Sequence, residues 1–316
     1  MYSRMKFLIG CLFFFSLVTN ASAEERVDYS ASIRAIDATH VEVNGVDIAY
    51  KVLGEAADPA IVLIMGLGGS HILWGDNLPN QLVEAGYRVV LFDNRDVGES
   101  EYMTEAGDPV IWWEFIKAEF GFDVNAAYDL SDMAEDSVAL MDALQLDQAH
   151  IVGASMGGMI AQILVARYPE RALSLTSIMS TPGFGNHLPP PGEMGGFSET
   201  PEGETEEETK ARFEGFGFYA DSVPRQLMAI LKSGDRSDEV KTIHVPTLVL
   251  HGKDDTLIPI AHGEYTAELI QGSKFVAFEG MGHNMPPEVL PNIVSNMLTH
   301  MKGSIPIYSG FDSNGR

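Results

Sequence analysis

The chain has 316 residues and is 45% hydrophobic, which is enough to build a large core in one α/β domain with an insertion. Its formal net charge at pH 7 is −25 and no basic patch is visible, which excludes a nucleic-acid partner. The acidic excess indicates a highly soluble surface or, alternatively, a field that favours neutral or cationic substrates over polyanions.

The first 23 residues have the pattern of a secretory signal peptide. Arg4 and Lys6 precede a short apolar run at residues 7–18, and an Ala-Ser-Ala cleavage site ends at Ala23. The run is too short to span a bilayer comfortably, so we expect no stable membrane span. Most of it follows Cys11, which argues against lipidation of that cysteine, the only one in the chain. We expect export to the periplasm or medium after cleavage, without disulfides.

Strands dominate the next part of the chain. Residues 38–53 predict a hairpin with its turn at Asn44 and Gly45, and residues 61–65 and 88–92 predict two further strands. Strands that alternate with helices favour a mostly parallel sheet, with its site at the carboxyl ends of the strands.

The segment at residues 102–128 is aromatic. It contains Trp112, Trp113 and several phenylalanines, for which packing is favoured over a cage around a ligand. Residues 130–144 then predict an amphipathic helix.

Residues 153–157 read G-A-S-M-G, a G-x-S-x-G pattern at a predicted junction of strand and helix. Residues 149–152 are a short apolar run, and residues 156–167 carry apolar side chains at helical spacing. A serine held at such a junction adopts a cramped backbone and is presented beside the positive end of a helix dipole. Ser155 is therefore the candidate nucleophile, with a tight structural turn as the alternative.

The alternation breaks for about sixty residues after a predicted strand at residues 173–179. Residues 182–196 are rich in glycine and proline, Thr205 opens a capping box, and residues 224–232 predict another helix. We interpret residues 180–241 as a small, mainly helical lid, whose glycine- and proline-rich part is mobile and gates entry.

An acid and a base are expected after the last two strands, in the chain order serine, acid, histidine. Residues 245–250 predict a strand followed by Asp255, the favoured acid, with Asp254 as the alternative. Residues 274–278 predict the last strand, and His283 follows in a glycine-rich loop as the candidate base. The histidines elsewhere have structural interpretations, among them His150, His251 and His300.

An oxyanion hole requires two backbone N–H groups. Met156, which follows the serine, supplies one, and Leu67 in the glycine-rich loop at residues 66–70 is the candidate for the other. The loop lacks the third glycine of a dinucleotide-binding frame, which has His71 in its place. For His71, the alternatives are a side chain that lines the pocket and one at the surface or at the start of a helix. No zinc spacing is present, so we expect neither a metal nor a cofactor.

These motifs resemble the α/β-hydrolase superfamily over roughly residues 38–302, and within it the bacterial esterases named after aclacinomycin methylesterase. The resemblance implies a serine hydrolase that acts on carboxylic esters, small methyl esters among them. It rests on residues 64–68, 92–100, 152–159, 177–181 and 280–283.

The expected fold is thus a mostly parallel α/β-hydrolase sheet flanked by helices. The predicted division is a signal peptide at 1–23, a core at 24–179 and 242–302, a lid at 180–241 and a tail at 303–316. The predicted substrate is a small or medium ester cleaved through an acyl-enzyme; the oligomeric state is undetermined. The alternatives are an amide, C–C or peracid bond cleaved by the same triad, or an inactive ligand-binding fold.

Overall fold

The computed structural model describes residues 31–185, 188–189, 192 and 204–304. The predicted signal peptide lies outside these residues, as do most of the predicted tail and part of the glycine- and proline-rich segment.

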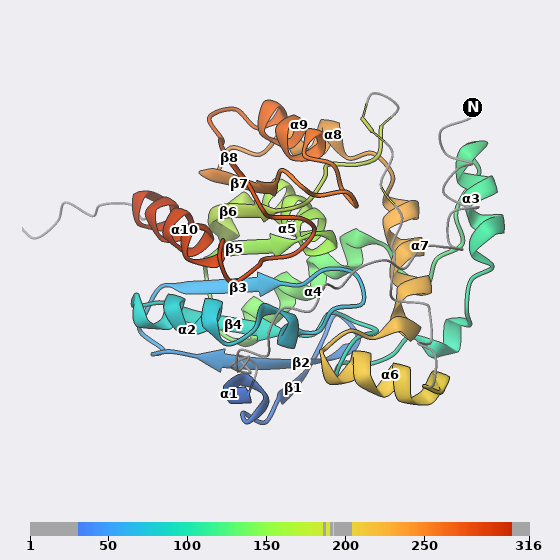
Figure 1. Ribbon diagram of the computed structural model, residues 1–316, viewed down its shortest axis with the longest axis horizontal. Coiled ribbons are helices and arrows are strands. Elements are labelled where there is room, and N and C mark those ends of the chain that lie inside the picture. Colours follow the sequence, from blue (N-terminus) through green and yellow to red (C-terminus); the bar gives the residue numbers. More distant parts are fainter. Residues whose placement is uncertain (1–30, 186–187, 190–191, 193–203, 305–316) are drawn as a thin grey trace, which may run out of the picture.

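An eight-stranded sheet forms the centre of the molecule, with strand order β1-β2-β4-β3-β5-β6-β7-β8 (Figure 1). The pairs β1–β2 and β2–β4 are antiparallel, and all the other pairs are parallel. The mostly parallel sheet predicted from the sequence is therefore confirmed. The strands are β1 Thr39–Val43, β2 Val46–Leu53, β3 Ala60–Ile64, β4 Arg88–Phe92, β5 Ala149–Ala154, β6 Ala172–Ile178, β7 Thr247–Gly252 and β8 Lys274–Phe278.

Helices cover both faces of this sheet. One face carries α4, α5, α8 and α9, and the opposite face carries α2 and α10. The helices are α1 Ala31–Arg34, α2 Asn77–Glu84, α3 Ile111–Glu119, α4 Leu130–Ala143, α5 Met156–Arg167, α6 Glu206–Gly215, α7 Val223–Ser233, α8 Ser237–Val240, α9 Ala261–Leu269 and α10 Leu290–Ser304.

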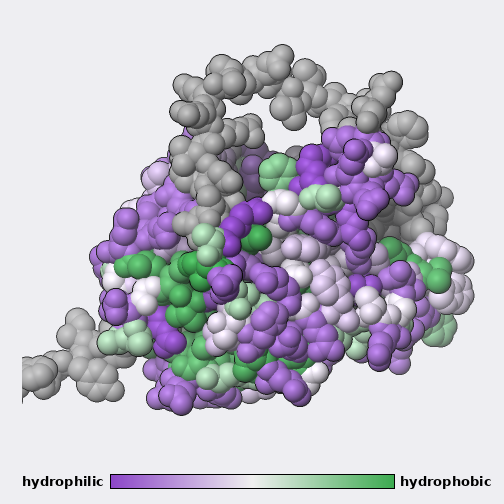
Figure 2. All heavy atoms as spheres, turned by 90° about the horizontal axis from the view of Figure 1, so that it is seen from below, coloured by the Kyte–Doolittle hydropathy of each residue, from purple (hydrophilic) through white to green (hydrophobic). Residues whose placement is uncertain are grey.

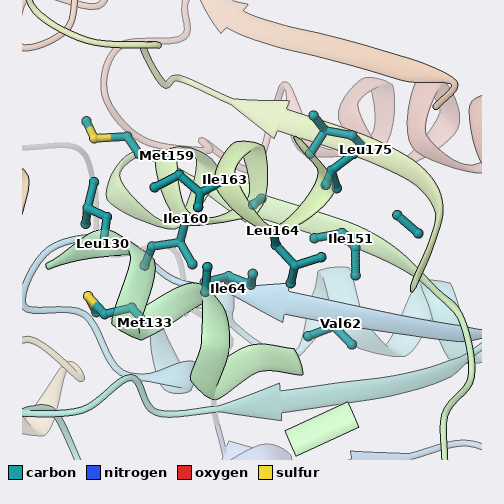
Figure 3. Packing of buried hydrophobic residues seen from close by; sticks show 14 of the residues in the cluster. Val62, Ile64, Leu130, Met133, Ile151, Met159, Ile160, Ile163, Leu164 and Leu175 are labelled. Atoms are coloured by element: carbon teal, nitrogen blue, oxygen red, sulfur yellow. The ribbon is translucent and has the colours of Figure 1, made fainter. Parts of the chain in front are cut away.

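Strand β3 is buried on both faces, as expected for a central parallel strand. Val62 and Ile64 belong to the core on the α4–α5 side, whereas Ile61 and Leu63 belong to the core on the α2–α10 side. This alternation follows from the two-residue period of a strand. Figure 3 shows the first of these cores, in which side chains of α4 and α5 pack on β3, β5 and β6.

The predicted hairpin turn is also present. Asn44 and Gly45 join β1 to β2 with φ values of 50° and 72°, the left-handed conformations that a two-residue hairpin turn requires.

Helices α6, α7 and α8 occupy the segment predicted as a lid. Thr205 caps α6 through a capping box with Glu208, as predicted. Helix α7 lies beyond the carboxyl ends of the central strands, with α3 outside it (Figure 1). It contacts α3 on one side and α4 on the other.

The aromatic side chains of α3 are more exposed than packing implies. Trp112 is 52% exposed and Trp113 is 49% exposed, with their rings edge to face at 5.8 Å. The packing interpretation is therefore wrong for these two residues. The physical reason is that α3 packs on α7 rather than on the sheet, so only part of its surface is covered. Other apolar side chains exposed in and beside α3 are Val110, Ile116, Phe120 and Phe122.

The surface in Figure 2 is mostly hydrophilic, with hydrophobic residues in separate groups, in keeping with the large negative charge. Within the described part of the chain, no helix has both the length and the apolar character needed to cross a membrane.

Candidate active site

The backbone at Ser155 forms a sharp turn between β5 and α5. Ser155 has φ 55° and ψ −121°, which is an uncommon conformation for a residue with a side chain. Its N–H donates to the carbonyl of Ile178 on β6 at 2.9 Å, which fixes the turn to the neighbouring strand. The strand, turn and helix thus lie where the sequence predicted them.

The glycines on either side of Ser155 allow the strand and helix to approach each other. A Cβ on Gly153 would lie 2.1 Å from the carbonyl oxygen of Gly157, and one on Gly157 would lie 2.0 Å from that of Ile64. Both contacts are with backbone, which cannot move aside without displacing β3 or α5. Glycine is therefore required at both positions by the close packing of this turn.

Ser155, His283 and Asp255 form one hydrogen-bonded chain. His283 Nε2 lies 2.9 Å from Ser155 Oγ, and His283 Nδ1 lies 2.8 Å from Asp255 Oδ2. With the proton on Nδ1, the imidazole donates to the carboxylate and accepts the serine proton at Nε2. The loops after β5, β7 and β8 therefore bring together the three side chains selected from the sequence.

The two candidate acids occupy different environments. Asp255 is only 5% exposed, and its Oδ1 accepts hydrogen bonds from the N–H groups of Leu257 at 3.0 Å and Ile258 at 2.8 Å. Asp254 is exposed, and its carboxylate accepts from the N–H of Gly280. Only Asp255 lies against the histidine, and backbone donors hold its second oxygen in place.

The loop at residues 66–70, here called the oxyanion loop, contacts the serine directly. A Cβ on Gly66 would lie 3.0 Å from Ser155 Cβ. Within this loop the N–H of Gly69 donates to the carbonyl of Gly66, and the N–H of Gly68 donates to Gln226 Oε1. The N–H of Leu67 takes part in neither bond, and that of Met156 is the first in α5, where no carbonyl of the helix can pair with it.

His251 was given only a structural interpretation from the sequence, but it lies against the acid. Its Nε2 donates to the carbonyl of Ile258 at 2.8 Å and is 3.5 Å from Asp255 Oδ2. Burial is the main influence on the pKa of His251 and lowers it. This effect outweighs the hydrogen bond to Ile258 and the charge of Asp255, which both raise the pKa. His251 is thus a neutral support for the acid loop, at a position four residues before Asp255.

His71 is buried at the start of a 3₁₀ helix, His71–Trp74, which agrees with a helix-start position and not with a surface one. Its Nδ1 lies 2.7 Å from Asp93 Oδ1, and Asp93 also accepts from the backbone N–H groups of His71 and Glu99. Asp93 therefore ties the end of the oxyanion loop to the loop after β4.

Sequence analysis missed a buried charged cluster that joins α7 to the loop after β4. Arg225 Nε donates to Asp96 Oδ1 at 2.9 Å, and Tyr128 Oη donates to Asp96 Oδ2 at 2.6 Å. Next to it, Arg95 makes two hydrogen bonds to Asp136. The signal available in the sequence was the presence of Arg95 and Asp96 in the loop after a buried strand, because charged residues that are buried there require partners. Their partners could not be read from sequence. Among the described residues, no group of histidine, cysteine or carboxylate side chains could hold a metal ion.

Comparison with known proteins agrees with this architecture. Residues 59–204 match the family model described as alpha/beta hydrolase fold. The chain is 27% identical over 298 residues to "Rhodomycin D methylesterase DauP" from Streptomyces sp. (strain C5), covering 80% of this chain and 94% of that protein. It is 25% identical over 291 residues to "Bifunctional esterase/perhydrolase DCH" from Acinetobacter calcoaceticus, covering 82% and 97% of the two chains.

A solved structure supports the fold independently. An esterase from Rhodococcus sp. ECU1013 superposes with a TM-score of 0.65 at 23% identity, covering 84% of this chain and 99% of that one. The sheet order, the turn at Ser155 and these similarities agree with the resemblance noted in the sequence. The chain has the α/β-hydrolase fold, and its similarity to these proteins supports a hydrolase.

Proposed function

We propose that the protein is a serine esterase that cleaves small or medium carboxylic esters, methyl esters among them. The observation that carries the proposal is the hydrogen-bonded chain from Ser155 through His283 to Asp255. Such a chain activates a hydroxyl that is otherwise a weak nucleophile.

In the first half-reaction, His283 Nε2 takes the proton of Ser155 as Oγ attacks the ester carbonyl carbon. The N–H groups of Leu67 and Met156 donate to the oxyanion that forms, and Asp255 stabilises the imidazolium. The C–O bond to the alcohol then breaks, and the alcohol leaves with the proton from His283. What remains is an acyl group on Ser155.

In the second half-reaction, water attacks the acyl carbonyl while His283 takes its proton. The same two N–H groups hold the second oxyanion, and Ser155 leaves with the proton as the carboxylic acid is released. These two half-reactions require no cofactor. The mechanism differs from that of superfamily members that attack through an aspartate, because Ser155 occupies the turn after β5.

The substrate class is supported by similarity to proteins named methylesterase and esterase/perhydrolase. The second name keeps perhydrolysis as the alternative reaction of the same triad, because hydrogen peroxide can replace water in the second half-reaction. We also propose that residues 180–241 form a lid, and that this favours soluble esters over lipid or polymer surfaces. The position of α7 beyond the strand ends supports a lid (Figure 1).

The test is kcat/KM for p-nitrophenyl esters from acetate to palmitate, for methyl esters and for emulsified triolein, with Ser155→Ala as the blank. We expect a maximum at short or medium chains. A maximum at palmitate, or a rate jump at the oil–water interface, would instead identify a lipase. Hydrogen peroxide added with acetate or a short ester tests the perhydrolase alternative through peracid formation.

A further inference from the structure

The oxyanion loop is bound along its length by a segment far away in the sequence, residues 217–226 between α6 and the first turns of α7 (Figure 1). The N–H of Ser70 donates to the carbonyl of Gly217 at 2.8 Å, and the N–H of Tyr219 donates to that of Gly68 at 2.7 Å. Gly69 and Phe218 thus form an antiparallel bridge. Part of the proposed lid is therefore paired with the oxyanion loop through a short antiparallel bridge.

Gln226 completes this attachment from the first turns of α7. Its side chain is fully buried; Oε1 accepts from the N–H of Gly68 at 2.7 Å and Nε2 donates to the carbonyl of Arg95 at 3.0 Å. Rotating the amide by half a turn would face donor to donor and acceptor to acceptor, so only one orientation satisfies both partners. The side chain is a fixed bridge between two loops that flank the site.

The hydrogen bond between Gly68 and Gln226 helps to fix the orientation of the Leu67 amide. The Gly66 carbonyl and the Leu67 N–H belong to one planar peptide, and the carbonyl is bonded to the N–H of Gly69. The next peptide contains the N–H of Gly68, which is bonded to Gln226. Two successive peptide planes are therefore fixed, and Gln226 fixes the second one from outside the loop.

Gly68 cannot readily find a substitute for this partner. It has φ +66°, and a Cβ at this position would lie 2.8 Å from the Phe218 ring, so the backbone here is closely packed. Without Gln226 the Gly68 N–H becomes a buried donor without a partner, which favours rotation of the loop until a partner is found. Rotation at Gly68 moves the Leu67 amide, which acts only within a few tenths of an ångström of its correct place.

We propose that Gln226 is a positioning residue that holds the oxyanion loop in its active conformation. Helix α7 is then part of the catalytic framework and not a freely opening lid. The proposal rests on the proposed function, because the Leu67 amide matters only if an oxyanion forms beside Ser155.

The experiment compares Gln226→Met with Gln162→Met. Gln162 is a matched control because it is also a fully buried helical glutamine, but its amide donates to Ser177 on β6 and not to the oxyanion loop. We expect Gln226→Met to lower kcat/KM by about 10- to 100-fold, less than complete loss of an oxyanion donor. Gln162→Met should change it by less than about threefold.

Two inhibitors separate positioning from a general structural effect. An alkyl trifluoromethyl ketone forms an oxyanion adduct with the serine, so its inhibition constant should rise in parallel with the loss of kcat/KM. The corresponding alcohol forms no adduct, and its inhibition constant should stay within about twofold. Equal weakening of both inhibitors would overturn the proposal.

Hydrogen exchange supplies a readout that needs no turnover. Exchange at the amides of residues 67–69 should be at least about tenfold faster in Gln226→Met than in Gln162→Met. Unchanged exchange overturns the proposal whatever the activity, whereas faster exchange in a protein without esterase activity overturns only the proposed function. If Gln226→Met does not fold, as judged by circular dichroism, Gln226→Ala gives the same comparison, because the bond is lost without adding bulk.

Discussion

The catalytic serine and the outer helices flank the same site but are held in place by different means. The turn at Ser155 is fixed by backbone packing between β3, β5 and α5, with no room for a Cβ at Gly153 or Gly157. Helix α7 is attached to the loops beside the site through the polar side chains of Arg225 and Gln226, and α3 packs on α7. The conformation of the first region is therefore sensitive to added side-chain volume at its glycines. The position of α7 depends on a few buried polar bonds.

The two regions also differ in how much of their surface is buried. Both faces of β3 are buried, whereas α3 leaves Trp112 and Trp113 about half exposed. The candidate nucleophile is thus placed next to a strand that is buried on both faces, whereas α3 lies at the exposed outside. Altering each region separately should give different phenotypes: loss of catalysis in the first, and loss of stability or positioning in the second.

The largest effect is expected in the first region. Ser155→Ala and His283→Ala should each lower kcat/KM by roughly 10³- to 10⁶-fold, because the nucleophile and the base act as one unit. The melting temperature should change little, since the lost bonds lie at the surface of the site. Ester hydrolysis and labelling by a fluorophosphonate probe measure the effect. Labelling of Ser155→Ala at the wild-type rate would place the nucleophile elsewhere.

The next effect distinguishes the two aspartates. Asp255→Asn should lower kcat/KM by about 10³- to 10⁴-fold, because an amide cannot stabilise the imidazolium and favours the wrong tautomer. Asp254→Asn should stay within about threefold, since its carboxylate is exposed and, in the described part of the chain, accepts from the N–H of Gly280 at the surface. Steady-state rates of the two variants decide the matter. A greater loss in Asp254→Asn contradicts the assignment of the acid.

In the second region, Arg225→Met should lower the free energy of unfolding by about 3 kcal/mol, because the buried Asp96 loses its cation. Asp96 keeps the hydrogen bonds from Met103 and Tyr128, which limits the loss. Urea denaturation measures it, with Lys241→Ala as the control, since the Lys241–Asp238 pair is exposed. Equal urea midpoints for the two variants would mean that α7 does not depend on this ion pair.

A pH effect should come from the sheet. Burial, with a smaller contribution from the nearby His300, lowers the pKa of His150 to about 4. The His150 imidazole also contacts Ser174 and packs edge to face with Tyr87. The unfolded chain, with a histidine pKa near 6.5, binds more protons between these values, so stability present above about pH 6.5 is lost as pH falls toward 4.

Removal of this group should be visible in the slope. His150→Gln should reduce the fall in unfolding free energy by up to about 1.4 kcal/mol per pH unit across that window. Burial also lowers the pKa of His300, so part of the slope remains. Urea denaturation from pH 4 to 7 measures it. The same slope in His150→Gln and wild type would show that another group controls acid stability.

The smallest effect is expected from the amino terminus, which neither region includes. We propose that the chain is exported and cleaved after Ala23. A chain that begins at Glu24 should match the full chain in kcat/KM within about twofold, because the catalytic and supporting residues lie far beyond it in sequence. Mass spectrometry of protein from a secreting host should find Glu24 first. An intact Met1, or a lipid mass on Cys11, contradicts export by this route.

Local patterns determined much of this protein. The G-x-S-x-G turn could be recognised from sequence because tight contact of a strand and a helix excludes side chains at Gly153 and Gly157. The loop after β7 and the loop after β8 could be located because parallel strands end at one edge of the sheet. The capping box at Thr205 and the turn at Asn44-Gly45 depend on a few adjacent residues, and both are present in the structure.

Only the tertiary structure decided which distant residues support these local features. Gln226 binds Gly68 across 158 positions in sequence, and Arg225 binds Asp96 across 129. Neither residue belongs to a motif, because a buried glutamine or arginine is defined by its partner and not by its neighbours in the chain. The exposure of Trp112 and Trp113 was decided in the same way, since an aromatic run predicts burial only when another layer covers it, and here α3 is the outermost described layer.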